Sequence, residues 1–190
     1  MSIESEPQVA GELVKDQTLI SNKEMQNSLE NKGYGEIHKK NFFLKPFESL
    51  YLLYCDKLEL SKGKKKITFD SLMQTCIKNN EDALTKFLIY RDLRTRGYIV
   101  KDGFGFGSDF RVYERGHFKE KGAKYLVFSL IEGKQEKIGK LQKKIEQITQ
   151  MGKEPIIAVI ERRGEVIYYK ISRINFLKNK ENIDMQNFKF

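Results

Sequence analysis

Two hydrophobic periods follow one another in the second half of the chain and leave few possible architectures. Residues 135–150 place apolar side chains at spacings of three, four and three, with Lys or Gln opposite, which predicts an amphipathic helix. Residues 155–160 form an unbroken apolar run that is typical of a buried strand. A turn at residues 162–164 then predicts a hairpin with a partner strand over residues 166–171.

The segment before this unit predicts a helix and three short strands. Asn79 to Asp82 is a strong helix start, because side-chain oxygens satisfy the free amides and carboxylates stabilise the positive end of a helix. The helix is expected to run to about Arg96, and strands are predicted over residues 98–101, 109–114 and 124–131. The order of helix, three strands, helix and two strands predicts an α/β (mixed α+β) fold with a central mixed sheet flanked by helices.

Changes in the hydrophobic pattern divide the chain into four segments. Residues 1–32 are polar and predict a flexible N-terminal arm or a loosely attached strand pair. Residues 33–80 are expected to form a small N-terminal α/β domain. Residues 81–174 contain the helices and strands just described and form the second domain, and the Lys- and Asn-rich residues 175–190 are expected to be a tail.

Positive charge is concentrated away from the N-terminus. The 190 residues include 35 Lys and Arg against 26 Asp and Glu, whereas residues 1–40 hold five lysines against seven carboxylates. Residues 41–190 therefore carry the whole positive excess. Such a balance favours a polyanion as partner, nucleic acid before a membrane surface, because Lys and Arg replace the counterions condensed on phosphates. Solubility is the alternative explanation of the same charge.

Several classes of site are excluded by residue type and spacing. No run approaches the roughly 18–20 apolar residues of a membrane span, so neither insertion nor secretion is expected. Cys55 and Cys76 make neither a zinc framework nor a disulfide scaffold, which fits a reducing cytoplasm. No residues have metal-ligand spacing, and we expect neither a metal nor a cofactor. The glycine-rich residues 103–107 lack the Lys-Ser or Lys-Thr of a phosphate loop and indicate a turn.

Three side chains have the chemistry that RNA cleavage through the 2′-hydroxyl requires. The reaction needs a base for the hydroxyl proton, an acid for the leaving 5′-oxygen and a cation beside the phosphorane charge. Tyr113, His117 and Lys153 supply these three types. Spacing alone equally fits a strand-end aromatic residue, a solvated loop histidine and a lysine that flanks a strand.

Longer stretches of the sequence resemble a known family. They are, in chain order, Tyr90–Lys101, Phe106–Gly116 with Phe-Arg-Val-Tyr at 110–113, Tyr125–Val127, Ile156–Ile160 and Val166–Tyr169. Together they resemble the archaeal tRNA-splicing endonuclease (tRNA-intron lyase) family over nearly all of residues 81–173. Residues 45–60 resemble the N-terminal domain of the same family.

This resemblance implies a subunit that cleaves precursor tRNA at the bulge-helix-bulge of its intron boundaries. It implies a catalytic C-terminal nuclease domain, cleavage without a metal, and 2′,3′-cyclic phosphate and 5′-hydroxyl ends. It also implies a homo- or hetero-oligomer, either a tetramer or a dimer of double-length chains. Tyr113 matches the tyrosine of the family that acts as general base, and Lys153 matches its transition-state-stabilising lysine.

The histidine departs from the pattern of the family. The family places its acid three residues before the tyrosine of Tyr-Leu-Val, and Gly122 stands there in this chain. Either His117, in the same loop, serves as the acid, or the chain is a non-catalytic structural or RNA-binding subunit of a heteromeric enzyme. Retention of both Tyr113 and Lys153 favours the first alternative. A basic scaffold protein without RNA chemistry, the third alternative, rests on composition alone.

The loop between the last two predicted strands also departs from the family. In the family this loop is acidic and enters a basic cleft of a neighbouring subunit. Here residues 161–165 keep two carboxylates but add two arginines. We therefore expect a different docking partner or a more salt-sensitive contact, the alternative being an exposed hairpin tip.

Overall fold

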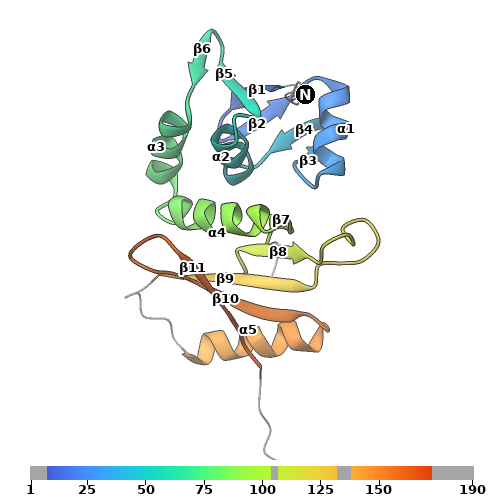
Figure 1. Cartoon of the computed structure of the whole chain (residues 1–190), viewed down its shortest axis with the longest axis vertical. Helices are drawn as coiled ribbons and strands as arrows, with labels where there is room; N and C mark the ends of the chain where they lie inside the picture. Colours follow the sequence, from blue (N-terminus) through green and yellow to red (C-terminus); the bar gives the residue numbers. More distant parts are fainter. Residues whose placement is uncertain (1–7, 104–106, 132–137, 173–190) are drawn as a thin grey trace, which may run out of the picture.

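The computed structural model has two sheets, with a long helix lying between them (Figure 1). It describes residues 8–103, 107–131 and 138–172. The predicted tail over residues 175–190 lies outside the described residues. The mixed α+β fold class is confirmed, and no helix in the described ranges is long and apolar enough to cross a membrane.

The first sheet has six strands in the order β3-β4-β2-β1-β5-β6. Most pairs are antiparallel, but β1 pairs with β5 in parallel, so the first strand of the chain lies inside the sheet. The elements of this part are β1 (Val9–Val14), β2 (Gln17–Ile20), α1 (Lys23–Asn31), β3 (Glu36–His38), β4 (Asn41–Leu44), α2 (Pro46–Tyr54), β5 (Leu58–Lys62), β6 (Lys65–Ile67) and α3 (Phe69–Asn79).

Residues 9–31 do not form the predicted flexible arm, and the alternative strand pair is present as β1 and β2 but lies inside the sheet instead of being loosely attached. These residues form β1, β2 and α1 and belong to the six-stranded sheet domain. The sequence hides β1 because Val9 and Leu13 are its only buried apolar side chains. Gly11 lies between them, and a Cβ atom there would overlap the methyl group of Thr18. The inward-facing position between Val9 and Leu13 must therefore be glycine. This interrupts the alternation of apolar residues by which a strand is recognised in a sequence.

The second sheet has five strands in the order β11-β10-β9-β8-β7. Only β9 and β10 run parallel, and the other neighbours are antiparallel. Its elements are α4 (Ala83–Thr95), β7 (Ile99–Asp102), β8 (Phe110–Tyr113), β9 (Tyr125–Ile131), α5 (Ile138–Gln150), β10 (Glu154–Ile160) and β11 (Val166–Lys170). These elements agree with the predicted strand and helix order, which stands within one or two residues for the strands.

The two faces of this sheet are covered by different helices, as the alternation along β9 shows. Val127 joins the large core that also contains residues of α4, whereas its neighbours Leu126 and Phe128 cluster with Ile148 of α5. Figure 1 shows α4 above the sheet and α5 below it. The sheet is therefore flanked by helices on both faces, as the periodicity predicts.

Three aromatic rings join the two sheet domains into one core. Phe47 of α2 lies 4.8 Å from Tyr90 of α4 and 5.2 Å from Phe110 of β8, measured between ring centres. All three side chains are buried. Edge-on and tilted ring contacts of this kind add about 0.5–1.5 kcal/mol per pair to the burial of their surface. The contact fixes the orientation of the second sheet relative to the first.

Candidate active site

The topology of the second sheet gathers three chain segments at one of its edges. Tyr113 ends β8, while Lys124 and Lys153 stand just before β9 and β10. The register pairs Val112 with Tyr125 and Tyr125 with Glu154, so these three positions lie side by side. Since neighbouring strands are about 4.8 Å apart, the backbones at Tyr113 and Lys153 are separated by roughly 10 Å. Two long side chains at that separation can both reach one phosphate.

Lys153 is fixed by the turn that joins α5 to β10. Gly152 has a φ of +68°, a conformation that favours glycine, and the amide of Lys153 donates to the carbonyl oxygen of Ile148 at 3.2 Å. The Nζ atom of Lys153 donates to the carbonyl oxygen of Ala123 at 2.5 Å. The ammonium group is thereby tied to the end of the loop that leads into β9.

Gly122, where the resemblance predicts a histidine, lies beside this ammonium group. A Cβ atom built on Gly122 would be 3.6 Å from Nζ of Lys153, and no closer atom would meet it. The structure thus brings Tyr113, Lys153 and the Gly122 position to one sheet edge. The position next to the lysine carries no side chain.

Tyr113 contacts an aromatic residue that the sequence did not single out. Its ring meets Phe118 edge to face, with ring centres 4.9 Å apart and an angle of 87° between planes. Within the described part of the chain, the hydroxyl group of Tyr113 has no hydrogen-bond partner. Phe118 belongs to residues 114–124, which we name the β8–β9 loop. Its position depends on tertiary contacts, so no local sequence pattern predicts it.

His117 lies on the same loop but is directed to a carboxylate. Its Nδ1 atom is 3.2 Å from Oε2 of Glu120, and its side chain is 37% exposed. The backbone around it forms a tight turn, in which the carbonyl oxygen of His117 accepts from the amides of Glu120 and Lys121. The loop residue that packs against the ring of Tyr113 is therefore Phe118, whereas His117 contacts Glu120.

An ion pair joins the two ends of the β8–β9 loop. Nζ of Lys124 donates to Oε1 of Glu114 at 2.8 Å. This hydrogen bond lowers the pKa of Glu114, and the same contact raises the pKa of Lys124 above its ordinary value. The pair therefore keeps both charges at neutral pH. It was not predicted, although opposite charges flanking a loop between paired strands are a usable signal.

The loop and its surroundings are net basic. The loop carries four Lys or Arg against two Glu, and Lys153 adds another positive charge beside it. The guanidinium of Arg115 lies 4.8 Å from the ring centre of Tyr98. Such a surface attracts phosphates, and exposed ring and guanidinium faces can stack with unpaired bases. No group of three or more metal-ligating side chains occurs among residues 8–103, 107–131 and 138–172.

Comparison with known proteins decides the family of this chain. Residues 9–73 match the N-terminal domain of tRNA intron endonuclease, and residues 83–168 match its catalytic C-terminal domain. The chain belongs to the tRNA intron endonuclease family. The resemblance noted in the sequence is thereby confirmed. The N-terminal match begins at β1, so it includes the strands that the predicted boundary at residue 33 left out.

Curated relatives in the tRNA intron endonuclease family cover most of the chain. The tRNA-splicing endonuclease of Thermococcus gammatolerans is 34% identical over 151 residues, which are 79% of this chain and 89% of the relative. That of Pyrococcus furiosus is 33% identical over 146 residues, 77% and 84% of the two chains. That of Methanococcus vannielii is 32% identical over 164 residues, 86% and 93%. Tyr113, His117, Gly122 and Lys153 all lie within the catalytic-domain match.

Proposed function

We propose that this protein is a subunit of a tRNA-splicing endonuclease and cleaves precursor tRNA at its intron boundaries. The observation that carries the proposal is the sheet edge where Tyr113 and Lys153 lie beside a basic loop, inside a match to the catalytic domain of the family. Phosphates of the bulge-helix-bulge substrate would bind there through charge and RNA shape, with little reading of base sequence.

The proposed reaction uses the RNA 2′-hydroxyl as nucleophile. The deprotonated hydroxyl oxygen of Tyr113 takes the proton of that 2′-hydroxyl, and the 2′-oxygen attacks the adjacent phosphorus atom. The bond from phosphorus to the 5′-oxygen breaks, and an acid protonates the leaving oxygen. The products are a 2′,3′-cyclic phosphate and a 5′-hydroxyl. Lys153 stabilises the additional negative charge on the phosphorane. Side chains fill every role, so we expect cleavage to persist with EDTA present.

His117 is the proposed acid. The contact between its Nδ1 atom and Glu120 leaves Nε2 as the nitrogen that can deliver a proton to the leaving oxygen. The alternative is a non-catalytic subunit that supplies basic surface to an active partner, and one observation favours it: glycine at position 122, next to Lys153. The backbone of Gly122 is not in the left-handed region, so a larger residue is sterically permitted there.

Two substitutions separate these alternatives. We would measure cleavage of a minimal bulge-helix-bulge RNA by the purified chain in EDTA, for the wild type, His117→Ala and Gly122→His. Cyclic-phosphate product from the wild type that is lost in His117→Ala supports a self-sufficient enzyme that uses His117. An inactive wild type that gains cleavage through Gly122→His identifies a natural non-catalytic subunit. Glu120→Gln is the matched control, since it changes the partner of His117 without removing the imidazole.

Assembly is proposed to use the loop between β10 and β11. Residues 161–165 form a tight exposed turn, closed by a bond from the amide of Gly164 to the carbonyl oxygen of Glu161. A cavity of about 300 Å³ between the first sheet, α3 and α4 carries charges of both signs, as this loop does. Its charged residues are Lys15, Asp16, Lys45, Lys86 and Asp102.

This charge pattern complements the loop of a second subunit in a proposed tetramer. Lys15 of the cavity suits a carboxylate of the loop, and Asp16 suits one of the two arginines that distinguish this chain, whereas Lys45 and Lys86 already pair with Asp102 and Asp109. Reversing the arginines with Arg162→Glu and Arg163→Glu is expected to reduce the assembled mass seen by sedimentation, most at low salt.

Both cysteines are free thiols, in keeping with the reducing cytoplasm in which we place the enzyme.

A further inference from the structure

The first domain touches the β8–β9 loop at two places. Nζ of Lys119, on the loop, donates to Oδ1 of Asn31 at 2.7 Å, at the end of α1. Lys101 of β7 provides the second connection: its Nζ atom donates to the carbonyl oxygen of Gly35 at 2.6 Å and lies 5.9 Å from the ring centre of Phe118. The segment 31–35 therefore contacts the loop both directly and through Lys101.

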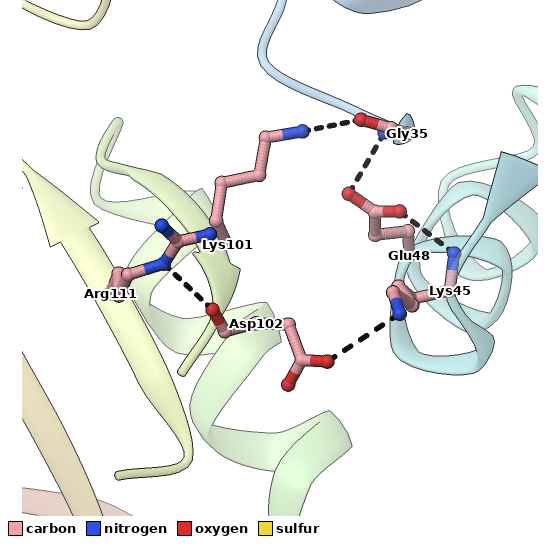
Figure 2. A network of polar contacts seen from close by, with 6 residues as sticks. All are labelled: Gly35, Lys45, Glu48, Lys101, Asp102 and Arg111. Carbon is pink, nitrogen blue, oxygen red and sulfur yellow. Dashed lines mark hydrogen bonds and ion pairs between the residues drawn. The ribbon is translucent and has the colours of Figure 1, made fainter. Parts of the chain in front are cut away.

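The hydrogen bond from Lys101 to the carbonyl oxygen of Gly35 is buried, and the amide of Gly35 in turn binds a buried carboxylate. Lys101 is only 9% exposed, and burial lowers the pKa of its ammonium group. Figure 2 shows Gly35 between this ammonium group and the carboxylate of Glu48. The amide of Gly35 donates to Oε1 of Glu48 at 3.0 Å, and the amide of Lys45 donates to Oε2 at 2.8 Å. A lysine held in this way has one position, unlike a solvated surface lysine.

The segment that accepts Lys101 is closely fitted to β7. Gly33 and Gly35 have φ values of +77° and +65°, which favour glycine. A Cβ atom on Gly33 would overlap the side chain of Ile99, the first residue of β7. The first domain therefore presents a rigid backbone to Lys101, and any shift of this segment would move the carbonyl group to which the lysine is bound.

Phe118 connects this buried contact to the candidate base. The Lys101 ammonium lies within cation–π range of its ring, and the Tyr113 ring packs against it edge to face. We propose that Lys101 and Phe118 are positioning residues, through which the segment 31–35 holds the ring of Tyr113 and the loop that carries His117. This inference rests on the proposed function for one point only, namely that Tyr113 takes part in RNA cleavage.

The first test reads the position of Tyr113 without any activity. In NMR spectra of the full chain with labelled tyrosines, the Tyr113 ring signals are assigned by their loss in Tyr113→Phe. Phe118→Leu is expected to move these signals, because the ring current of Phe118 is removed. Lys101→Met is expected to move them less, and in the same spectra Lys144→Met should leave them in place. Lys144 of α5 is the matched control, since its Nζ atom lies 5.5 Å from the ring centre of Phe128 of β9.

The second test separates positioning from general stability. Single-turnover cleavage is measured at saturating enzyme and well below each melting temperature. We expect Lys101→Met and Phe118→Leu to lower the rate constant about 10- to 100-fold with unchanged RNA affinity, because small misplacements of reacting groups have effects of this size. Phe118→Tyr keeps the ring and should restore the rate.

Each outcome decides the inference. Tyr113 signals that do not move in Lys101→Met overturn it, as does a rate constant that falls no further than in Lys144→Met. If the wild-type chain cleaves no RNA at all, the proposed function fails, and the spectra alone then decide. Movement of the Tyr113 signals supports the positioning role, and unmoved signals reject it.

Discussion

The two ends of strand β8 differ in how their polar side chains are satisfied. Asp109, just before the strand, accepts from the amide and the hydroxyl of Ser129, both at 2.7 Å, and lies 3.5 Å from Nζ of Lys86. Tyr113, at the other end, packs its ring against Phe118 and makes no side-chain hydrogen bond within the described residues, and nearby Lys153 binds one backbone carbonyl group.

This difference separates groups that stabilise the fold from groups that can serve a substrate. A partly buried carboxylate with every partner in place contributes to stability and has little left for a ligand. Tyr113 is partly exposed and Lys153 holds one hydrogen bond among the described residues, so both groups can exchange water for phosphate oxygens at a small cost in free energy. The same strand thus carries a structural end and a candidate catalytic end, and the following predictions test that division.

The largest effect is expected from Tyr113→Phe. Removing the hydroxyl takes away the proposed base, and general base catalysis contributes about 10²- to 10⁴-fold. The cleavage rate constant of the bulge-helix-bulge RNA should fall by that factor, measured in single turnover. The free energy of unfolding should change by less than about 0.5 kcal/mol, since no hydrogen bond within the described residues is lost. Cleavage as fast as in the wild type would remove Tyr113 from the mechanism.

Lys153→Met comes next. The substitution keeps an unbranched side chain but removes the positive charge, and loss of one transition-state-stabilising group lowers rates about 10²- to 10³-fold. Lys124→Met is the matched control at the same sheet edge, because Lys124 is occupied by Glu114. Single-turnover rates of the two variants should differ by at least tenfold. Equal losses would show that only the net charge of this edge matters.

At the structural end, Asp109→Ala should affect stability and not chemistry. The substitution leaves the amide and hydroxyl of Ser129 without their acceptor, which amounts to about 1–3 kcal/mol of unfolding free energy. Denaturant titration would measure this loss, with Glu59→Ala as a control at an exposed ion pair, because Glu59 lies 3.1 Å from Nζ of Lys66. At a temperature where the variant is folded, its cleavage rate constant should equal that of the wild type. A lower cleavage rate constant with an unchanged free energy of unfolding would contradict the structural role assigned to Asp109.

The smallest effect is expected from Glu114→Gln and depends on pH. Because Lys124 lowers the pKa of Glu114 in the folded protein, the pair adds stability above the ordinary value of 4.5, and this contribution is lost as pH falls through the lowered pKa. The raised pKa of Lys124 means that its part is present below 10.5 and lost as pH rises further. Melting temperatures of the wild type and Glu114→Gln should therefore differ at neutral pH and converge in acid. A difference that persists in acid would assign the effect to packing instead.

Much of the second domain could be predicted because its signals are local. The helical spacing of α5, the apolar run of β10 and the glycine turns fix the order of elements, whereas the strand order that brings Tyr113 and Lys153 to one sheet edge was not predicted. The first domain was harder. Its central strand β1 has Gly11 on the inward face, so the close packing that makes the strand central also removes its apolar signal.

The candidate site was predictable in its residue types but not in its contacts. Resemblance placed Tyr113 and Lys153, whereas Phe118 and Lys101 meet only because the first domain packs on β7 and the β8–β9 loop. The spacing of His117 from Tyr113 cannot show that the His117 ring meets Glu120, or that Gly122 lies at Lys153. Loop geometry follows from tertiary packing, which periodicity does not encode.

The aromatic contact of Phe47, Tyr90 and Phe110 has a consequence for how such chains diverge and recombine. Because these rings belong to different halves and share one hydrophobic core, neither half can be exchanged independently of the other. A hybrid that joins the first half of this chain to the second half of a distant relative would bring together surfaces shaped for other neighbours. Residues on the two sides of this contact are therefore expected to coevolve. The two halves should also unfold together, in a single cooperative melting transition.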